Sequence, residues 1–175
     1  MDIIEINNKL LASLHEQAEA SERKRMYYDL RTSPNDGGQR MLNVLLPGTK
    51  VPIHRHPNSN ENVLCLRGRL VEVLYEEDSC NRTAGVETQD RAEGLLLKEC
   101  ARILLDPSAG SYGCVVPAGV WHTVEVNEPA VIYEAKDGKY GEDGSETFDE
   151  HKAQISQDPS QSYFSNSLGD LKKNI

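Results

Sequence analysis

The sequence predicts an all-β sandwich or barrel with one N-terminal α-helix and an irregular C-terminal tail. Three observations carry this prediction: an amphipathic N-terminal stretch without Gly or Pro, a middle section of short strand-like runs, and a polar final section. Many short strands separated by turn residues are typical of sandwiches and barrels. We expect a helix and first strand in 1–30, packed on the barrel, the barrel itself in 31–140, and an acidic polar tail in 141–175.

The first element is predicted to be a helix from residue 8 to residue 25, with Asn7 or Asn8 as its N-cap. Apolar residues recur at steps of three and four, at Leu10, Leu11, Leu14 and Ala18. Basic residues at 23–25 would suit a helix C-terminus. An isolated helix of this length is marginal in water, so we expect its stripe to pack on the barrel exterior or on a second subunit.

After residue 25 the pattern changes to the two-residue alternation of strands, beginning at 26–30. Further strands are predicted at 39–46, 51–56, 60–66, 69–75, 96–106, 112–116, 120–126 and 130–136. Residues 92–105 have a helix-like composition, but their place between strands and the following Asp106-Pro107 favour a strand. The tail is expected to be extended, docking locally, with a helical turn at 167–173.

Composition and charge exclude several classes of protein. The chain has 175 residues and a net charge of −9, which disfavours nucleic-acid binding. No apolar run is long enough to span a membrane, and the N-terminus lacks the pattern of a signal peptide, so we expect a cytoplasmic protein. Its cysteines, which form no C-x-x-C pair and are expected to be reduced thiols, are Cys65, Cys80, Cys100 and Cys114.

A short histidine-containing stretch is the strongest functional signal. Residues two apart in a strand point to the same face, so His54 and His56 project together. Residues 57–60 favour a hairpin turn, which would make Glu61 the start of the neighbouring strand and place it across from the histidine pair. Two neutral imidazoles and a carboxylate suit a divalent transition metal.

His122 is the candidate fourth ligand. Val120, Val124 and Val126 share its strand face, so we expect one imidazole pointing into an apolar interior. A single buried histidine is more often a hydrogen-bonded core residue than a ligand, and a lone H-x-H is weak evidence. The full spacing Gly48-x5-His54-x-His56-x4-Glu61-x6-Gly68, in contrast, should arise by chance on the order of once in ten thousand such chains.

That spacing matches the first cupin motif, and Pro117-x-Gly119-x2-His122 resembles the second. In the second motif Ser111 and Val126 stand where a leading Gly and a trailing Asn are expected, but neither is a ligand position. The resemblance implies a single cupin-type antiparallel jelly-roll barrel with one divalent metal at its mouth. The implied ligands are His54, His56, Glu61 and His122, a set that accommodates Fe, Mn, Zn, Ni, Co or Cu.

A narrower resemblance, to the WbuC family of cupin-fold metalloproteins, rests on residues 19–25, 39–43, 117–122 and 134–140. It covers about 8–140, with 80–93 as an insertion or a divergent loop, and WbuC proteins are associated with bacterial surface-polysaccharide gene clusters. It implies substrate contacts by Arg25, Asn43 and Lys136, with Tyr140 just beyond the last strand. Alternatively, Arg25 complements the helix end, Asn43 secures a turn, and Lys136 is a solvated strand end.

Four protein ligands leave one or two positions open on the ion, which is typical of catalytic sites. The first hypothesis is therefore an enzyme acting on a sugar, a sugar nucleotide or a related acid, either an isomerase or epimerase or an Fe(II)-type oxygenase. The second is a non-catalytic metal-dependent module that binds or senses a saccharide. A metal-free epimerase fits less well, because His15 and His151 lie in the helix and the tail. A homodimer is expected, as is common among cupins.

Overall fold

The computed structural model describes residues 3–77, 96–148 and 155–156. One helix, α1 (Asn8–Ala20), precedes the strands. The strands and one 3₁₀ turn are β1 (Arg25–Asp29), β2 (Gly38–Leu45), β3 (His54–Arg55), β4 (Glu61–Arg67), β5 (Leu70–Glu77), β6 (Leu97–Leu105), η2 (Pro107–Ala109), β7 (Gly113–Val116), β8 (Trp121–Glu125), β9 (Ala130–Asp137), β10 (Glu146–Thr147) and β11 (Ile155–Ser156).

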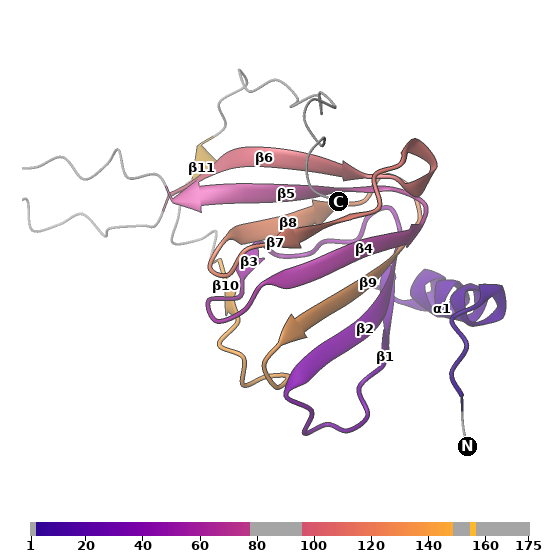
Figure 1. Cartoon of the computed structure of the whole chain (residues 1–175). Helices are drawn as coiled ribbons and strands as arrows, with labels where there is room; N and C mark the ends of the chain where they lie inside the picture. Colours follow the sequence, from indigo (N-terminus) through magenta and orange to yellow (C-terminus); the bar gives the residue numbers. More distant parts are fainter. Residues whose placement is uncertain (1–2, 78–95, 149–154, 157–175) are drawn as a thin grey trace, which may run out of the picture.

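Two sheets face each other across one interior (Figure 1). The first has the strand order β1-β2-β9-β4-β7 and the second the order β10-β3-β8-β5-β6-β11. Every pairing between the described strands is antiparallel except the parallel contact of β11 with β6. This is a cupin-like jelly roll with one N-terminal helix, as the sequence predicts.

Two elements are several residues shorter than predicted. Helix α1 ends at Ala20 rather than at residue 25, because Ser21 is already extended and Lys24 takes a left-handed φ of 55°. The basic residues therefore lie in the turn before β1, not in the last helical turn. Strand β3 keeps only His54–Arg55 of the predicted 51–56, since Pro52 has no N–H to donate to a neighbouring strand.

Helix α1 packs on the outer face of the first sheet (Figure 1). Asn7 caps it, its side chain accepting hydrogen bonds from the backbone N–H groups of Lys9 and Leu10. Apolar residues from the helix and from strands β2 and β9 form one buried cluster, which includes Leu11, Leu14, Ala18, Leu42, Val44 and Val131. The intramolecular alternative for the helix stripe is therefore confirmed.

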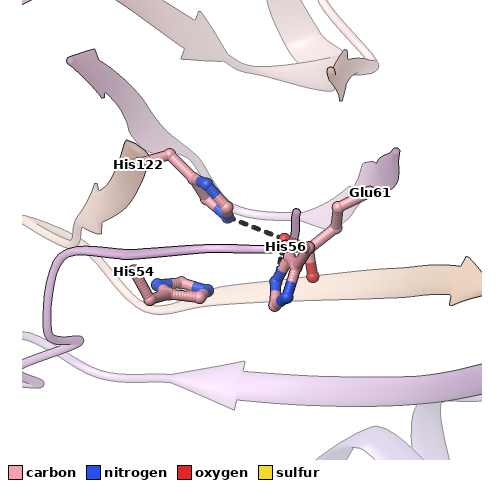
Figure 2. A group of neighbouring side chains, drawn as sticks. All are labelled: His54, His56, Glu61 and His122. Carbon is pink, nitrogen blue, oxygen red and sulfur yellow. Dashed lines mark hydrogen bonds and ion pairs between the residues drawn. The ribbon is translucent and has the colours of Figure 1, made fainter. Parts of the chain in front are cut away.

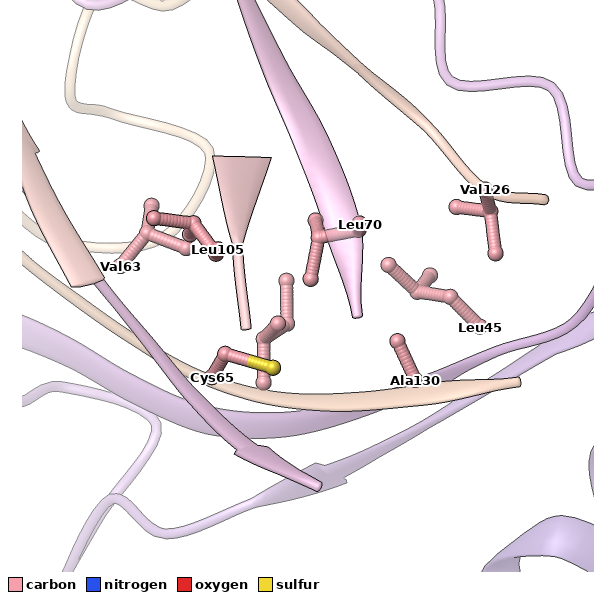
Figure 3. Packing of buried hydrophobic residues seen from close by; sticks show 8 residues of the cluster. Leu45, Val63, Cys65, Leu70, Leu105, Val126 and Ala130 are labelled. Carbon is pink, nitrogen blue, oxygen red and sulfur yellow. The ribbon is translucent and has the colours of Figure 1, made fainter. Parts of the chain in front are cut away.

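The interior between the sheets holds a second apolar cluster, drawn in Figure 3. It consists of Leu45, Val63, Cys65, Leu70, Leu105, Val126, Ala130 and Ile132. Cys65 is only 4% exposed and packs within this cluster. Nearby, Gly68 has a φ of +73°, and a Cβ there would lie 2.0 Å from the carbonyl oxygen of Pro129, so the turn between β4 and β5 requires glycine.

The first residues of the predicted tail lie against the barrel. Strand β10 pairs with β3, and Phe148 packs with Ile53, Leu97 and Trp121. The division of the chain at residue 140 stays a prediction, as does the tail's role. His151, Cys80 and the predicted turn at 167–173 lie outside the described residues. In the described part of the chain, no helix has the length and apolar character needed to cross a membrane.

Candidate metal centre

Strands from both sheets bring the four predicted ligands together at one end of the interior. His54 of β3 is directly paired with His122 of β8, and Glu61 is the first residue of β4 in the facing sheet. His56 follows β3. One potential ligand atom from each of the four residues lies within 4.8 Å of all the others. Figure 2 shows the three rings and the carboxylate converging on a single small volume, in the arrangement that the motif spacing predicts.

Each imidazole is held through its Nδ1 atom. The Nδ1 of His54 lies 3.0 Å from the carbonyl oxygen of Pro52, and that of His122 lies 2.9 Å from the carbonyl oxygen of Val120. Carbonyl oxygens only accept hydrogen bonds, so we infer that both Nδ1 atoms carry the proton. The Nε2 lone pairs are thereby left for another partner, which is the usual arrangement of metal-bound histidines.

His56 is held by a relay from a carboxylate. Its Nδ1 lies 2.8 Å from the Ser145 Oγ, which in turn donates to the Asp143 Oδ2 at 2.6 Å. Because the single hydroxyl proton of Ser145 is used toward Asp143, Ser145 accepts from the Nδ1 of His56. Gln39 also donates to Asp143, at 2.8 Å, so the relay is anchored to β2.

With these tautomers, acceptor atoms face one another at the centre. The Glu61 Oε2 lies 2.8 Å from the Nε2 of His122 and 3.2 Å from that of His56. A carboxylate and an imidazole lone pair do not attract each other without a proton or a cation between them. The Lys136 ammonium lies 3.0 Å from the Nε2 and 3.1 Å from the Nδ1 of His56, so one positive group already lies against this ring. The donor set therefore fits a divalent cation.

The charge states of the cluster also suit a metal. Burial, followed by the proximity of His122, lowers the pKa of His54 to about 4, so this ring is neutral at pH 7. Burial opposes ionisation of Glu61, but the close approach of His122 and His56 outweighs that effect and holds its pKa well below the usual range. Neutral imidazole and carboxylate are the forms that bind metal ions.

The four predicted substrate residues are not equally close to this centre. Lys136 touches His56, and its ammonium lies 3.5 Å from Asp143. Asn43 points into the same interior and donates to Glu134 at 2.8 Å. Arg25, the first residue of β1, donates a hydrogen bond to the carbonyl oxygen of Lys50. Tyr140 is 64% exposed, with the Arg31 guanidinium 5.3 Å from its ring centroid.

One sequence expectation about the site is wrong. His122 was expected to point into an apolar interior, but its ring faces the Glu61 carboxylate. The apolar cluster begins only at Val124, two residues further along the same strand face. The residues that sequence reasoning missed are Asp143 and Ser145. They stand in an acidic, glycine-rich stretch typical of a solvated turn, and no local signal shows that this stretch folds back on the site.

Comparisons with known proteins agree with this fold. A family model described as "Domain of unknown function (DUF6016)" matches residues 6–85, which is less than half of the chain. A comparison with curated proteins found no significant match. The WbuC resemblance is not tested by these matches and stays a prediction.

The solved structures that resemble this chain have low sequence identity to it. CapF, solved with the inhibitor 3-isopropenyl-tropolone, has a TM-score of 0.51 and 14% identity over 74% of this chain and 33% of its own. An oxalate oxidase in complex with the substrate analogue glycolate gives 0.47 and 15%, over 73% of this chain and 57% of its own. A cupin 2 domain-containing protein from Halorhodospira halophila gives 0.47 and 17%, over 73% and 72%. This chain thus spans about a third of CapF and just over half of the oxalate oxidase.

Fold and cluster together give a protein with a cupin-like jelly-roll fold and a cluster of three histidines and one glutamate that could hold a metal ion.

Proposed function

We propose that the protein binds one divalent transition metal through His54, His56, Glu61 and His122 and uses it to act on a small polar substrate. The observation that carries this proposal is the orientation of the rings: each Nδ1 is held by an acceptor outside the cluster. A merely structural histidine cluster has no need to turn the Nε2 atoms of His122 and His56 toward one carboxylate and to hold a third ring beside them. When bound, such an ion supplies Lewis acidity toward a substrate oxygen.

The residues around the centre would bind and orient that substrate. The Lys136 side chain is 12% exposed. Its ammonium group lies between His56 and Asp143, where it can donate a hydrogen bond to an electronegative substrate atom. Asn43 and Glu134 place a second polar pair on neighbouring strands β2 and β9. A sugar, or the sugar part of a nucleotide sugar, offers oxygen atoms for both contacts. Through the WbuC resemblance, we place this substrate in bacterial surface-polysaccharide metabolism.

The test has two parts. Purified protein should contain or take up one equivalent of a divalent metal, measured by inductively coupled plasma mass spectrometry after dialysis. The metal-loaded protein is then screened for turnover of nucleotide sugars and free monosaccharides, with Lys136→Met as the matched control. Turnover that depends on both the metal and Lys136 supports an enzyme. Metal-dependent binding of a saccharide without turnover supports the non-catalytic alternative, and no metal uptake contradicts both.

A further inference from the structure

Glu72 carries a buried carboxyl group and is not one of the four proposed metal ligands. It lies on β5 with the same strand parity as Leu70, whose side chain belongs to the apolar cluster between the sheets. The Glu72 side chain therefore points into the interior. The residue is 1% exposed, and neither of its carboxyl oxygens has a hydrogen-bond partner among the described residues. Buried polar groups in native proteins are nearly always paired, so an orphaned carboxyl group requires an explanation.

Its surroundings place Glu72 between the metal centre and the apolar cluster. It is paired with Val124, which is two residues beyond His122 on the same face of β8. Glu134, hydrogen-bonded to Asn43, faces the same interior from β9, which lies in the opposite sheet. Burial, and then the negative charge of Glu61, raise the pKa of Glu72 to about 8, and burial also raises that of Glu134 to about 8. These two carboxyl groups are therefore uncharged at pH 7, and an uncharged carboxyl group can both donate and accept a hydrogen bond.

Resting on the function proposed above, we propose that Glu72 contacts the substrate bound at the metal centre and is the innermost polar contact of the substrate site. The class of substrate that fits is a neutral molecule with hydroxyl groups on neighbouring carbons, such as a monosaccharide or a sugar alcohol. A hydroxyl group donates one hydrogen bond and accepts others, so it complements a protonated carboxyl group. One hydroxyl would face the metal centre and its neighbour would reach Glu72.

A structural role for Glu72 predicts that its replacement lowers thermal stability. If instead no protein group pairs with the carboxyl, replacing it by an apolar side chain of similar size removes an uncompensated desolvation cost and raises thermal stability. The same replacement would remove the contact with substrate. A gain in stability together with a loss of binding therefore identifies a group retained for function rather than for folding.

The experiment uses the full chain loaded with Co²⁺, whose visible absorption reports ligands entering the metal's surroundings. The probes are a panel of aldohexoses and the sugar alcohols that correspond to them. Variants are Glu72→Met, Glu72→Gln, and Glu76→Met as the matched control, because Glu76 is an exposed glutamate on the same strand. Metal content and the thermal midpoint are measured on every preparation.

We expect Glu72→Met to keep one metal per chain, to raise the thermal midpoint, and to weaken the spectral response to the best probe by about tenfold or more. Glu72→Gln should keep part of the response, because an amide also donates and accepts, and this variant serves if the methionine variant does not fold. Glu76→Met should change neither quantity. An unaltered response in Glu72→Met, or a lowered midpoint in both Glu72 variants, overturns the inference. Wild-type protein that binds Co²⁺ but answers to no probe overturns the proposed substrate class, whereas failure to bind Co²⁺ overturns the proposed function itself.

Discussion

The two ends of the barrel interior are built by the same strands but have opposite chemistry. Strand β9 contributes Ala130 and Ile132 to the apolar cluster and then, two and four residues further on, Glu134 and Lys136. Strands β4, β5 and β8 change in the same way. Each carries apolar interior residues toward one end of the barrel and a glutamate or histidine nearer the other. Figure 2 shows Glu61 and His122 at the polar end, and Figure 3 shows Val63, Cys65 and Leu70 at the apolar end.

The difference separates what stabilises the fold from what the fold positions. Burial of the apolar end is favourable at roughly 25 cal/mol per Å². Burial of the other end costs free energy, because lone pairs face a carboxylate there and Glu72 has no hydrogen-bond partner among the described residues. Buried polar groups that destabilise the fold are typical of functional sites. We therefore propose that the polar end of the interior binds a metal ion and its substrate.

The sharpest way to break this comparison is to remove one ligand. His56→Ala should reduce metal affinity by orders of magnitude and abolish any turnover, because only three of the four proposed ligands, His54, Glu61 and His122, remain. The fold should survive, since the apolar end is untouched. His15→Ala, in the half-exposed helix position, is the control and should change neither metal content nor activity. Metal stoichiometry and thermal midpoint are measured together; an unchanged stoichiometry with a lowered midpoint would mean that His56 only packs.

The opposite change targets the apolar end. Ile132→Ala should lower the free energy of unfolding by about 2–5 kcal/mol, because a fully buried side chain leaves a cavity in a packed cluster. Metal stoichiometry of the folded fraction should stay at the wild-type value. Urea denaturation and metal analysis of the same preparation check both parts. A loss of metal from the still-folded protein would show that the two ends are not independent.

The pH dependence of stability tests the polar end without a ligand. The pKa of Glu72 rises from 4.5 to about 8 on folding, so between these values the folded state holds a proton that the unfolded chain releases. Its contribution to stability therefore decreases as the pH rises through this range, by at most about 1.4 kcal/mol per pH unit. Groups near it that also titrate are Glu61, Glu134 and Cys114.

Chemical denaturation from pH 5 to pH 8 compares the wild type with Glu72→Gln. The stability of the wild type relative to the variant should fall across this range, since the variant cannot titrate at this position. Parallel stability curves for the two proteins would show that Glu72 has the same pKa in the folded and unfolded states.

The smallest effect is expected from the relay that holds His56. Ser145→Ala removes the acceptor of the His56 Nδ1 proton, and a partner of this kind is worth about 10- to 100-fold in metal affinity. Competition with a chelator at fixed pH measures this change. Ser13→Ala on the exposed side of α1 is the control. An affinity equal to that of the wild type would place Ser145 outside the metal's supporting shell.

The sequence predicted the ligand cluster well because local geometry determines it. The alternation of side chains places His54 and His56 on one side, and the cupin spacing includes Glu61. The predicted hairpin at 57–60 is wrong, because β3 and β4 lie in different sheets and Glu61 faces the histidines across the interior. The same reasoning could not find Ser145 or Asp143, which reach the site only because residues 141–148 fold back over the barrel. Glu72 was missed for another reason. A glutamate between two valines predicts a solvent-facing position in an ordinary alternating strand, and only the closed two-sheet interior makes that face a buried one.

X-ray absorption at the metal edge tests the central claim most directly. The measurement uses full-length protein loaded with Zn²⁺ or Co²⁺ and freed of excess ion by dialysis. The account predicts one ion per chain with three imidazole nitrogens and one carboxylate oxygen at about 2.0–2.2 Å. A bound ion without an imidazole signature, or with sulfur from a cysteine among its neighbours, would contradict it.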